Sequence, residues 1–153
     1  MEERQDYSVI KGPEKHLGNA WLLYVEGGYI PLEDENYMNS RQLEYFRMKL
    51  LSWREKLVKD CGETLDELKK GDMKEVDLLD QGAFEANTAN RLRIWDRNQE
   101  LIREIDEALS RIDNGVYGYC EETGEEIGLK RLEACPTATL SFEAQEWREL
   151  RTR

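Results

Sequence analysis

Apolar residues recur at steps of three and four along two long stretches of the chain, and this spacing predicts two helices. Asn39 precedes the first stretch as a good N-cap, and Gln42 stands where its side chain can reach back in a capping box. The segment between the stretches contains Gly71 and Gly82 and has little periodic apolar content. The two apolar seams consist of Leu43, Phe46, Leu50, Trp53, Leu57, Cys61, Leu65 and Leu68, and of Ile94, Leu101, Ile102, Ile105, Leu109, Ile112 and Val116.

Two amphipathic helices joined by a short break can cover each other's apolar seams. We therefore predict an antiparallel coiled-coil hairpin over residues 39–116, with its tip near residues 71–86. An arm of roughly 35 residues at ~1.5 Å per residue would project about 50 Å. Because such a hairpin satisfies its own seam, the pattern favours a monomer.

The two ends of the chain lack this periodicity and predict a small globular domain. Residues 1–38 contain two prolines and a glycine pair, which exclude one long helix, and an apolar run at 21–25. Residues 117–153 begin with short glycine-punctuated elements and end in a helical pattern. Because this part is too small to fold alone, we expect the N-terminal segment to pack on it. The side chains expected to hold it together are Tyr117, Tyr119, Ile127, Leu129, Leu132, Leu140, Phe142 and Trp147.

The predicted fold class is thus mainly α, with a long coiled-coil hairpin projecting from a small globular domain. That domain is formed by the N-terminal segment, the C-terminal segment and a C-terminal helix.

The charge of the chain limits its binding modes. Over 153 residues, 22 Lys and Arg stand against 33 Asp and Glu, which gives a formal net charge of −11. This charge excludes a basic sheath on a phosphate backbone as the main binding mode. No stretch approaches the ~20 apolar residues that span a bilayer, and the N-terminus shows no apolar signal core. Three cysteines without such a signal indicate reduced thiols, so we expect a cytoplasmic protein with no membrane partner.

Signatures of an enzyme are scarce. The single histidine, His16, has no base and orienting partner around it in the sequence. Glycine-rich phosphate loops, the HExxH motif and the GxSxG motif are absent from the sequence. The cysteines have no CxxC spacing, and Cys61 lies on the helical seam, as a small apolar side chain would. We therefore predict that the chain is not an enzyme.

The predicted tip of the hairpin is acidic. It carries Asp72, Glu75, Asp77, Asp80 and Glu85. Charged hairpin loops are usually only solvated. Asp77 and Asp80, however, are three residues apart and would face the same way on a helical turn. A long coiled coil can carry such carboxylates into a cleft that holds metal ions or cations.

Residues from about 29 to 150 resemble the DksA/TraR family of bacterial transcription factors. The tip sequence EVDLLDQGA resembles the family's DxxDxA pattern, and YGYCEETGEEIGLKRLEACPTATL resembles its globular segment. The resemblance implies that RNA polymerase is the partner and that the coiled coil enters its secondary channel. It also implies altered open-complex stability at ribosomal RNA and amino-acid promoters, a role in the stringent response with ppGpp as a candidate effector, and no sequence-specific DNA binding.

The resemblance assigns roles to residues of the hairpin. It implies that Asp77 and Asp80 are the two tip aspartates and that Arg97 contacts polymerase. Arg97 could equally be a surface arginine that is paired across the hairpin. Arg131 also matches the family, and for it we favour a structural role that ties the small domain to the base of the coil. Gly82 stands where the family usually has alanine, with Ala83 next to it, and glycine lowers helical order.

The zinc site of the family is degenerate in this chain. The family uses two CxxC pairs, and the four positions are here Cys120, Thr123, Ser141 and Ala144. A structural Zn²⁺ needs about four good ligands, and only one thiolate is present at these positions. We therefore predict no zinc, as in the zinc-less members of the family. A disulfide between Cys120 and Cys135 is the alternative, and a reducing cytosol disfavours it.

The positions that help to form the family's ppGpp site are also altered. Leu101 is retained, but Glu104, Cys135 and Gln145 replace residues that are usually basic. Because ppGpp is highly anionic, the loss of cations should weaken its binding. The resemblance therefore implies weak or altered ppGpp dependence.

Two other functions stay open. A Gre-like factor would use the tip carboxylates to share a Mg²⁺ and assist transcript cleavage. We rank this function second, because the globular segment resembles the DksA/TraR family and not the carboxyl domain of Gre factors. A helical-hairpin scaffold or chaperone would bind clients through its coil, and its tip aspartates would be dispensable.

Overall fold

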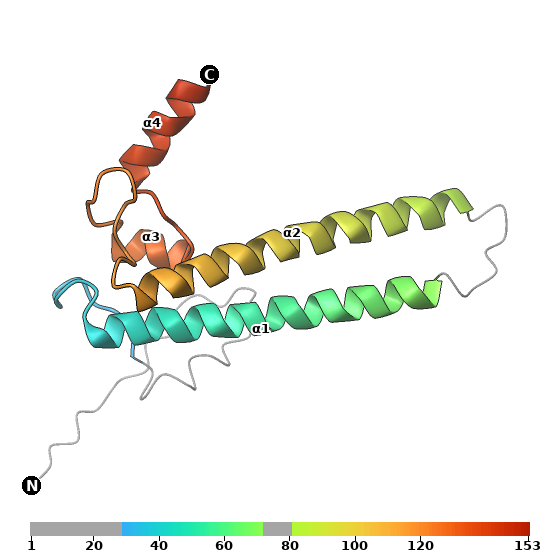
Figure 1. The fold of residues 1–153 in the computed structure, drawn as a ribbon, viewed down its shortest axis with the longest axis horizontal. Helices are drawn as coiled ribbons and strands as arrows, with labels where there is room; N and C mark the ends of the chain where they lie inside the picture. Colours follow the sequence, from blue (N-terminus) through green and yellow to red (C-terminus); the bar gives the residue numbers. More distant parts are fainter. Residues whose placement is uncertain (1–28, 72–80) are drawn as a thin grey trace, which may run out of the picture.

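The computed structural model describes residues 29–71 and 81–153, and the described residues form four helices. The helices are α1 (Ser40–Gly71), α2 (Gln81–Asp113), α3 (Leu129–Ala134) and α4 (Phe142–Thr152). α1 and α2 run side by side as a long hairpin, and the small domain sits where α1 begins and α2 ends (Figure 1). The predicted fold class, mainly α with a long helical hairpin, is confirmed. The segment expected to pack on the small domain lies mostly at residues 1–28, outside the described residues.

The N-cap of α1 forms at Asn39 as the sequence predicts, but the Gln42 side chain does not bond to the Asn39 N–H as in a capping box. The Oδ1 of Asn39 accepts a hydrogen bond from the Gln42 N–H at 2.9 Å. Gln42 reaches back, and its Oε1 accepts from the N–H of Met38 at 2.8 Å, one residue before the N-cap. The Gln42 side chain is fully buried and also donates to the carbonyl of Leu32. This bonding fixes the entry of the chain into α1.

The seam between α1 and α2 is best buried near the base of the hairpin. Phe46 and Leu50 of α1 and Ile105 of α2 have no exposed surface. Cys61 is buried on the seam, which confirms its prediction as a small apolar residue. Three seam predictions were wrong: Leu65, Ile94 and Val116 are exposed. For Val116 the reason is that α2 ends at Asp113, so this residue lies beyond the helix.

Ion pairs cross the hairpin at several levels. Arg47 pairs with Asp113 at 2.6 Å and Arg54 with Asp106 at 2.7 Å. Arg91 of α2 pairs with Glu67 of α1 near the far end. Exposed ion pairs of this kind each contribute little to the free energy of unfolding, so we infer that their main effect is to fix the register between the two helices.

The small domain encloses a short core of its own. Tyr117 and Leu132 are almost fully buried, and Ile127 and Leu140 are buried as predicted. Tyr119 and Leu129 are half-buried.

Two residues expected in this core are exposed: Phe142 by 62% and Trp147 by 65%. The physical reason is that α4 projects away from the domain (Figure 1), and only Ala144 of this helix is buried. In the described part of the chain, no helix is both long enough and apolar enough to cross a membrane.

Replacing Gly118 by alanine should destabilise the small domain. Gly118 has a φ of +89°, and an added Cβ would lie 2.8 Å from the Cγ of Met38. The positive φ would strain an alanine backbone, and the added Cβ would overpack against Met38. Because both effects destabilise the folded state, we expect the free energy of unfolding to fall by about 2 to 4 kcal/mol. Urea titration followed by circular dichroism measures this loss.

Gly124→Ala is the matched control. Gly124 has a φ of +73°, but within the part of the chain that the structure describes an added Cβ would have open space around it. This variant should lose only about 1 kcal/mol, the cost of the backbone conformation. Equal losses in the two variants would show that the contact with Met38 costs nothing.

Candidate functional site

The predicted tip is only partly covered by the structure. Asp77 and Asp80 lie outside the described residues. Gly82 and Ala83 belong to the first turn of α2, and both are exposed. Among the described residues, none outside the nearby turn of the helix has a heavy atom within 4 Å of a Cβ placed at Gly82, so no packing contact with them requires glycine there.

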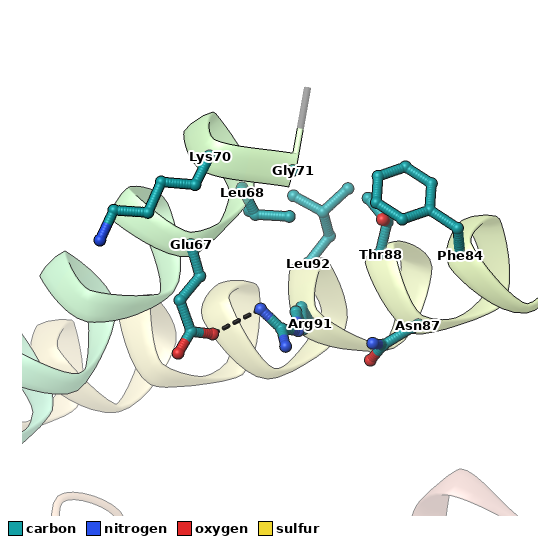
Figure 2. Close-up of a pocket in the computed structure, with 9 residues that line it drawn as sticks. All are labelled: Glu67, Leu68, Lys70, Gly71, Phe84, Asn87, Thr88, Arg91 and Leu92. Carbon is teal, nitrogen blue, oxygen red and sulfur yellow. Dashed lines mark hydrogen bonds and ion pairs between the residues drawn. The ribbon is translucent and has the colours of Figure 1, made fainter. Parts of the chain in front are cut away.

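A cavity of about 530 Å³ lies between the last turns of α1 and the first turns of α2, as Figure 2 shows. Its apolar wall is formed by Leu68, Phe84 and Leu92. The ion pair of Glu67 with Arg91 bridges the two helices at this cavity. The sequence does not predict this cavity, because it depends on how far the two helices separate toward the tip. The remaining lining residues are Lys70, Gly71, Asn87 and Thr88.

Arg97 is exposed on the outer surface of α2. Three other arginines of this helix are paired, Arg91 with Glu67, Arg103 with Glu100 and Arg111 with Glu121. Arg97 makes no ion pair with any residue in 29–71 or 81–153, so a pair across the hairpin does not form there.

The structure brings together only part of the predicted ppGpp site. The Thr137 hydroxyl donates to the Glu104 carboxylate at 3.4 Å and lies 3.7 Å from the Cys135 sulfur. Leu101 lies one turn before Glu104 and packs, half-buried, against the core. Gln145 has its hydrogen bonds elsewhere, with Arg131 and Glu149.

Two of the other three positions of the degenerate zinc site, Thr123 and Ser141, contribute hydrogen bonds to the sulfur of Cys120. Burial acts to raise the pKa of this thiol. Hydrogen bonds from the Thr123 hydroxyl and from the backbone N–H groups of Ser141, Thr123 and Glu122 outweigh burial and lower the pKa to about 6. The Ser141 hydroxyl is engaged as the N-cap of α4, where it accepts from the Ala144 N–H at 3.3 Å.

This donor set does not fit a structural zinc ion. It offers one thiolate, two hydroxyl groups and the methyl group of Ala144, whereas structural Zn²⁺ is held by four Cys or His ligands. Within the described ranges, no three His, Cys, Asp or Glu side chains are grouped so that they could hold a metal.

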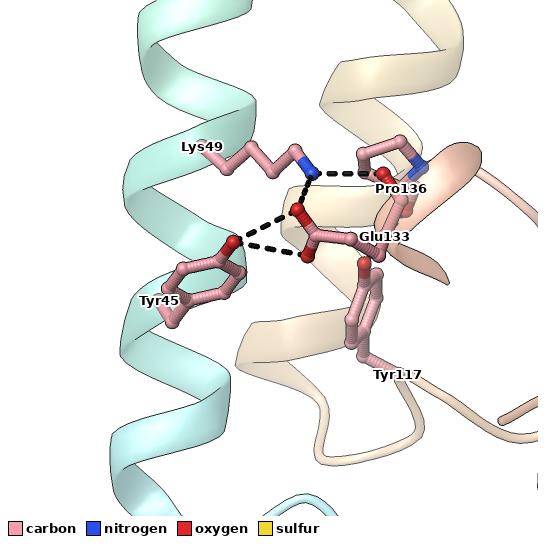
Figure 3. Close-up of polar contacts among 5 residues, drawn as sticks. All are labelled: Tyr45, Lys49, Tyr117, Glu133 and Pro136. Carbon is pink, nitrogen blue, oxygen red and sulfur yellow. Dashed lines mark hydrogen bonds and ion pairs between the residues drawn. The ribbon is translucent and has the colours of Figure 1, made fainter. Parts of the chain in front are cut away.

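A carboxylate on α3 contacts two residues of α1 (Figure 3). Glu133 accepts from the Tyr45 hydroxyl at 2.9 and 3.0 Å and from the Lys49 ammonium at 2.6 Å. Burial and this carboxylate together hold the pKa of Tyr45 far above its usual value, so the hydroxyl stays a donor. Beside this group, the Tyr117 hydroxyl donates to the carbonyl of Pro136 at 2.7 Å.

Sequence reasoning missed Glu133 and favoured Arg131 for tying the small domain to the coil. The Arg131 guanidinium instead bonds to the Leu140 carbonyl and to the Gln145 side chain, both within the small domain. Gln145 also donates to Glu149. No signal in the sequence separates Glu133 from the other acidic residues, because its partners lie 84 and 88 positions away.

The stability of the protein should rise with pH between about 6 and about 9. The pKa of Cys120 is lowered to about 6 in the folded state from an ordinary value of 9.0. Between these two pKa values the unfolded chain binds more protons than the folded chain does. The contribution of Cys120 to stability is therefore fully present above the unfolded pKa of 9.0 and is lost as the pH falls through the folded pKa of about 6. Urea midpoints of the wild type and of Cys120→Ser across this range measure the effect.

The Cys120→Ser variant should lack this part of the pH dependence, while Cys61 and Cys135 stay present in both proteins. Identical pH profiles for the two proteins would show that Cys120 stays a thiol throughout this range.

Two family models match the chain in succession. The model of the DnaK suppressor protein DksA, N-terminal domain, matches residues 42–112, which cover most of the hairpin. The model of the prokaryotic dksA/traR C4-type zinc finger matches residues 115–149, which cover the small domain and most of α4.

Similar proteins align along most of this chain. It is 52% identical over 137 residues to the RNA polymerase-binding transcription factor DksA of Caulobacter vibrioides, which covers 90% of this chain and 96% of that protein. It is 36% identical over 143 residues to the protein of the same name from Escherichia coli, over 92% of this chain and 95% of the other. The structure of transcription factor DksA2 from Pseudomonas aeruginosa matches with a TM-score of 0.72 and 40% identity, over 76% of this chain and 90% of that one.

These relatives are named as transcription factors, which agrees with the prediction that this chain is not an enzyme. The two family models and the identity along nearly the whole length show that this chain belongs to the DksA/TraR family.

Proposed function

We propose that this chain is a transcription regulator that binds RNA polymerase and inserts its hairpin into the secondary channel of that enzyme. The observation that carries the proposal is the hairpin of α1 and α2, which extends from the small domain and leads to the segment with Asp77 and Asp80 (Figure 1). The 32 residues of α1 correspond to about 48 Å at ~1.5 Å per residue. The relatives from Caulobacter vibrioides and Escherichia coli are named as RNA polymerase-binding factors, which supports the same partner here.

In this proposal the tip alters the stability of open complexes at ribosomal RNA and amino-acid promoters. Asp77 and Asp80 supply the carboxylates that act there, and Gly82 and Ala83 follow them at an exposed helix start. The exposed guanidinium of Arg97 contacts polymerase, where it can form a two-pronged pair with a carboxylate.

The net charge of −11 supports a protein partner over direct, sequence-specific contact with DNA. A polymerase partner places the chain in the cytoplasm. The intrachain burial of the seam supports a monomer.

The altered ppGpp positions support a weaker response to this effector. Glu104 places a carboxylate where the family usually has a cation, and Thr137 already donates to it. Gln145 is held by Arg131 and Glu149. Since neither side chain offers a positive charge to a phosphate, ppGpp gains little from binding here.

The donor set around Cys120 supports a zinc-less small domain. The core around Tyr117, Leu132 and Leu140 takes the role that a metal crosslink would otherwise have. Zinc analysis of the purified protein should find far less than one equivalent, and a value near one would contradict the proposal.

The tip prediction is that Asp77→Asn/Asp80→Asn keeps polymerase binding and loses inhibition. The replacement removes two charges with almost no change in size. We expect the inhibition of a ribosomal RNA promoter at saturating factor to fall at least about tenfold, the effect of ~1.4 kcal/mol on the open-complex equilibrium, with little change in the Kd for polymerase. The measurement is single-promoter transcription in vitro with a bacterial RNA polymerase.

Asp66→Asn/Asp96→Asn is the matched control, because both carboxylates are exposed on the sides of the hairpin. It should inhibit like the wild type. A wild type that neither binds polymerase nor inhibits would overturn the proposal and favour a scaffold. Stimulated transcript cleavage in a stalled complex would favour a Gre-like factor.

The effector prediction is that ppGpp enhances wild-type inhibition only weakly. Glu104→Lys/Cys135→Arg/Gln145→Lys restores cations at the three altered positions. In this variant we expect ppGpp to act at a concentration at least about tenfold lower, because hydrogen bonds between charged groups are strong. The same transcription assay with a ppGpp titration measures the response.

Glu107→Lys/Glu146→Lys raises the net charge by the same amount at exposed positions elsewhere and should leave the response unchanged. Strong enhancement of the wild type by ppGpp would contradict the effector prediction without affecting polymerase binding.

A further inference from the structure

Side chains, and not backbone packing, attach α3 to the hairpin. Among the four described helices, only α1 and α2 approach each other closely along their backbones. α3 has six residues, too few to stand alone, and Leu132 is its buried anchor. The long side chains that meet at Glu133 therefore bridge the gap between α3 and α1 (Figure 3).

Two side chains of α1 donate to the Glu133 carboxylate. Tyr45 and Lys49 are four residues apart, so they lie on the same face of the helix and reach the carboxylate together. The Lys49 ammonium also donates to the main-chain carbonyl of Glu133 at 2.8 Å. A cation at this place additionally favours the negative end of the short helix.

The surroundings make this contact stronger than an ordinary surface pair. Tyr45 is 1% exposed, and the Lys49 side chain is 16% exposed. The Glu133 side chain is 45% exposed, so only its inner part is shielded from water. Loss of the carboxylate would leave a shielded hydroxyl and a shielded ammonium without this partner.

The hairpin amplifies any rotation at this contact. Gly71, the end of α1, lies 26 positions after Tyr45, which is about 39 Å at ~1.5 Å per residue. A rotation of about 10° between the small domain and the hairpin would move the far end by about 7 Å.

We propose that Glu133 is a positioning residue that holds the small domain at one angle to the hairpin and so sets where the tip lies on polymerase. This inference rests on the proposed function, since it requires both parts of the chain to contact the enzyme. Tyr45 and Lys49 act through Glu133 and belong to the same group.

The first experiment measures the angle without polymerase. Residual dipolar couplings of the ¹⁵N-labelled protein report the relative orientation of the α1 and small-domain amides. The wild type should fit one alignment tensor, whereas Glu133→Ala should require two. Glu125→Ala is the control, because it removes an exposed glutamate from the same domain, and it should behave like the wild type. A single tensor for Glu133→Ala would overturn the proposal.

The second experiment separates binding from effect on the enzyme. For Glu133→Ala we expect maximal inhibition at saturating factor to fall about twofold or more, with a change in Kd below about threefold, because the site is misplaced and not removed. A merely destabilised protein would instead regain full inhibition at saturation. Unchanged maximal inhibition would overturn the functional role of Glu133.

The variant Lys49→Met removes the α1 side of the same contact, and it can be measured in place of Glu133→Ala if that variant folds poorly. If the residues act as one unit, adding Lys49→Met to Glu133→Ala should cause no further loss of maximal inhibition. Additive losses would overturn a shared role. A wild type without polymerase binding would defeat the proposed function, while the dipolar couplings would still decide whether Glu133 fixes the angle.

Discussion

The apolar seam between α1 and α2 is the contact on which the rest of the structure depends, because long exposed helices in water need tertiary packing to persist. Phe46 and Leu50 of α1 are fully buried with Ile105 of α2. The Phe46 ring also packs on Tyr117, with ring centroids 5.7 Å apart. The same layer of side chains therefore closes the base of the hairpin and forms the floor of the small domain.

Burial along the seam decreases toward the tip, where Leu65 and Ile94 are exposed and a cavity separates the helices. Stability within one protein follows such gradients of apolar contact. The ion pair of Glu67 with Arg91 crosslinks the helices at this cavity. The hairpin thus combines a firmly packed base with an end that is loosely packed, as an element that must adapt to a partner would be.

Local features were predictable from the sequence, and features that depend on distant contacts were not. The cap at Asn39 and the burial of Cys61 follow from spacing within a few residues. Phe142 and Trp147 have the spacing of a buried face, yet they are exposed because no described element covers α4 there. Glu133 looks like any surface acid until the fold brings it to α1. The family resemblance predicted which residues stand at zinc and ppGpp positions, but the hydrogen bonds of these residues required the structure.

The small domain and the hairpin depend on each other. Without four metal ligands, the small domain has only its short core around Tyr117 and Leu132, and Phe46 of the hairpin completes that core. The hairpin in turn receives its orientation from the domain through Glu133. A metal would make the small domain rigid by itself. In a small domain without zinc, as we propose for this chain, rigidity has to come from the shared apolar layer and from the side chains that cross to α1, so a change at the base would alter the position of the tip.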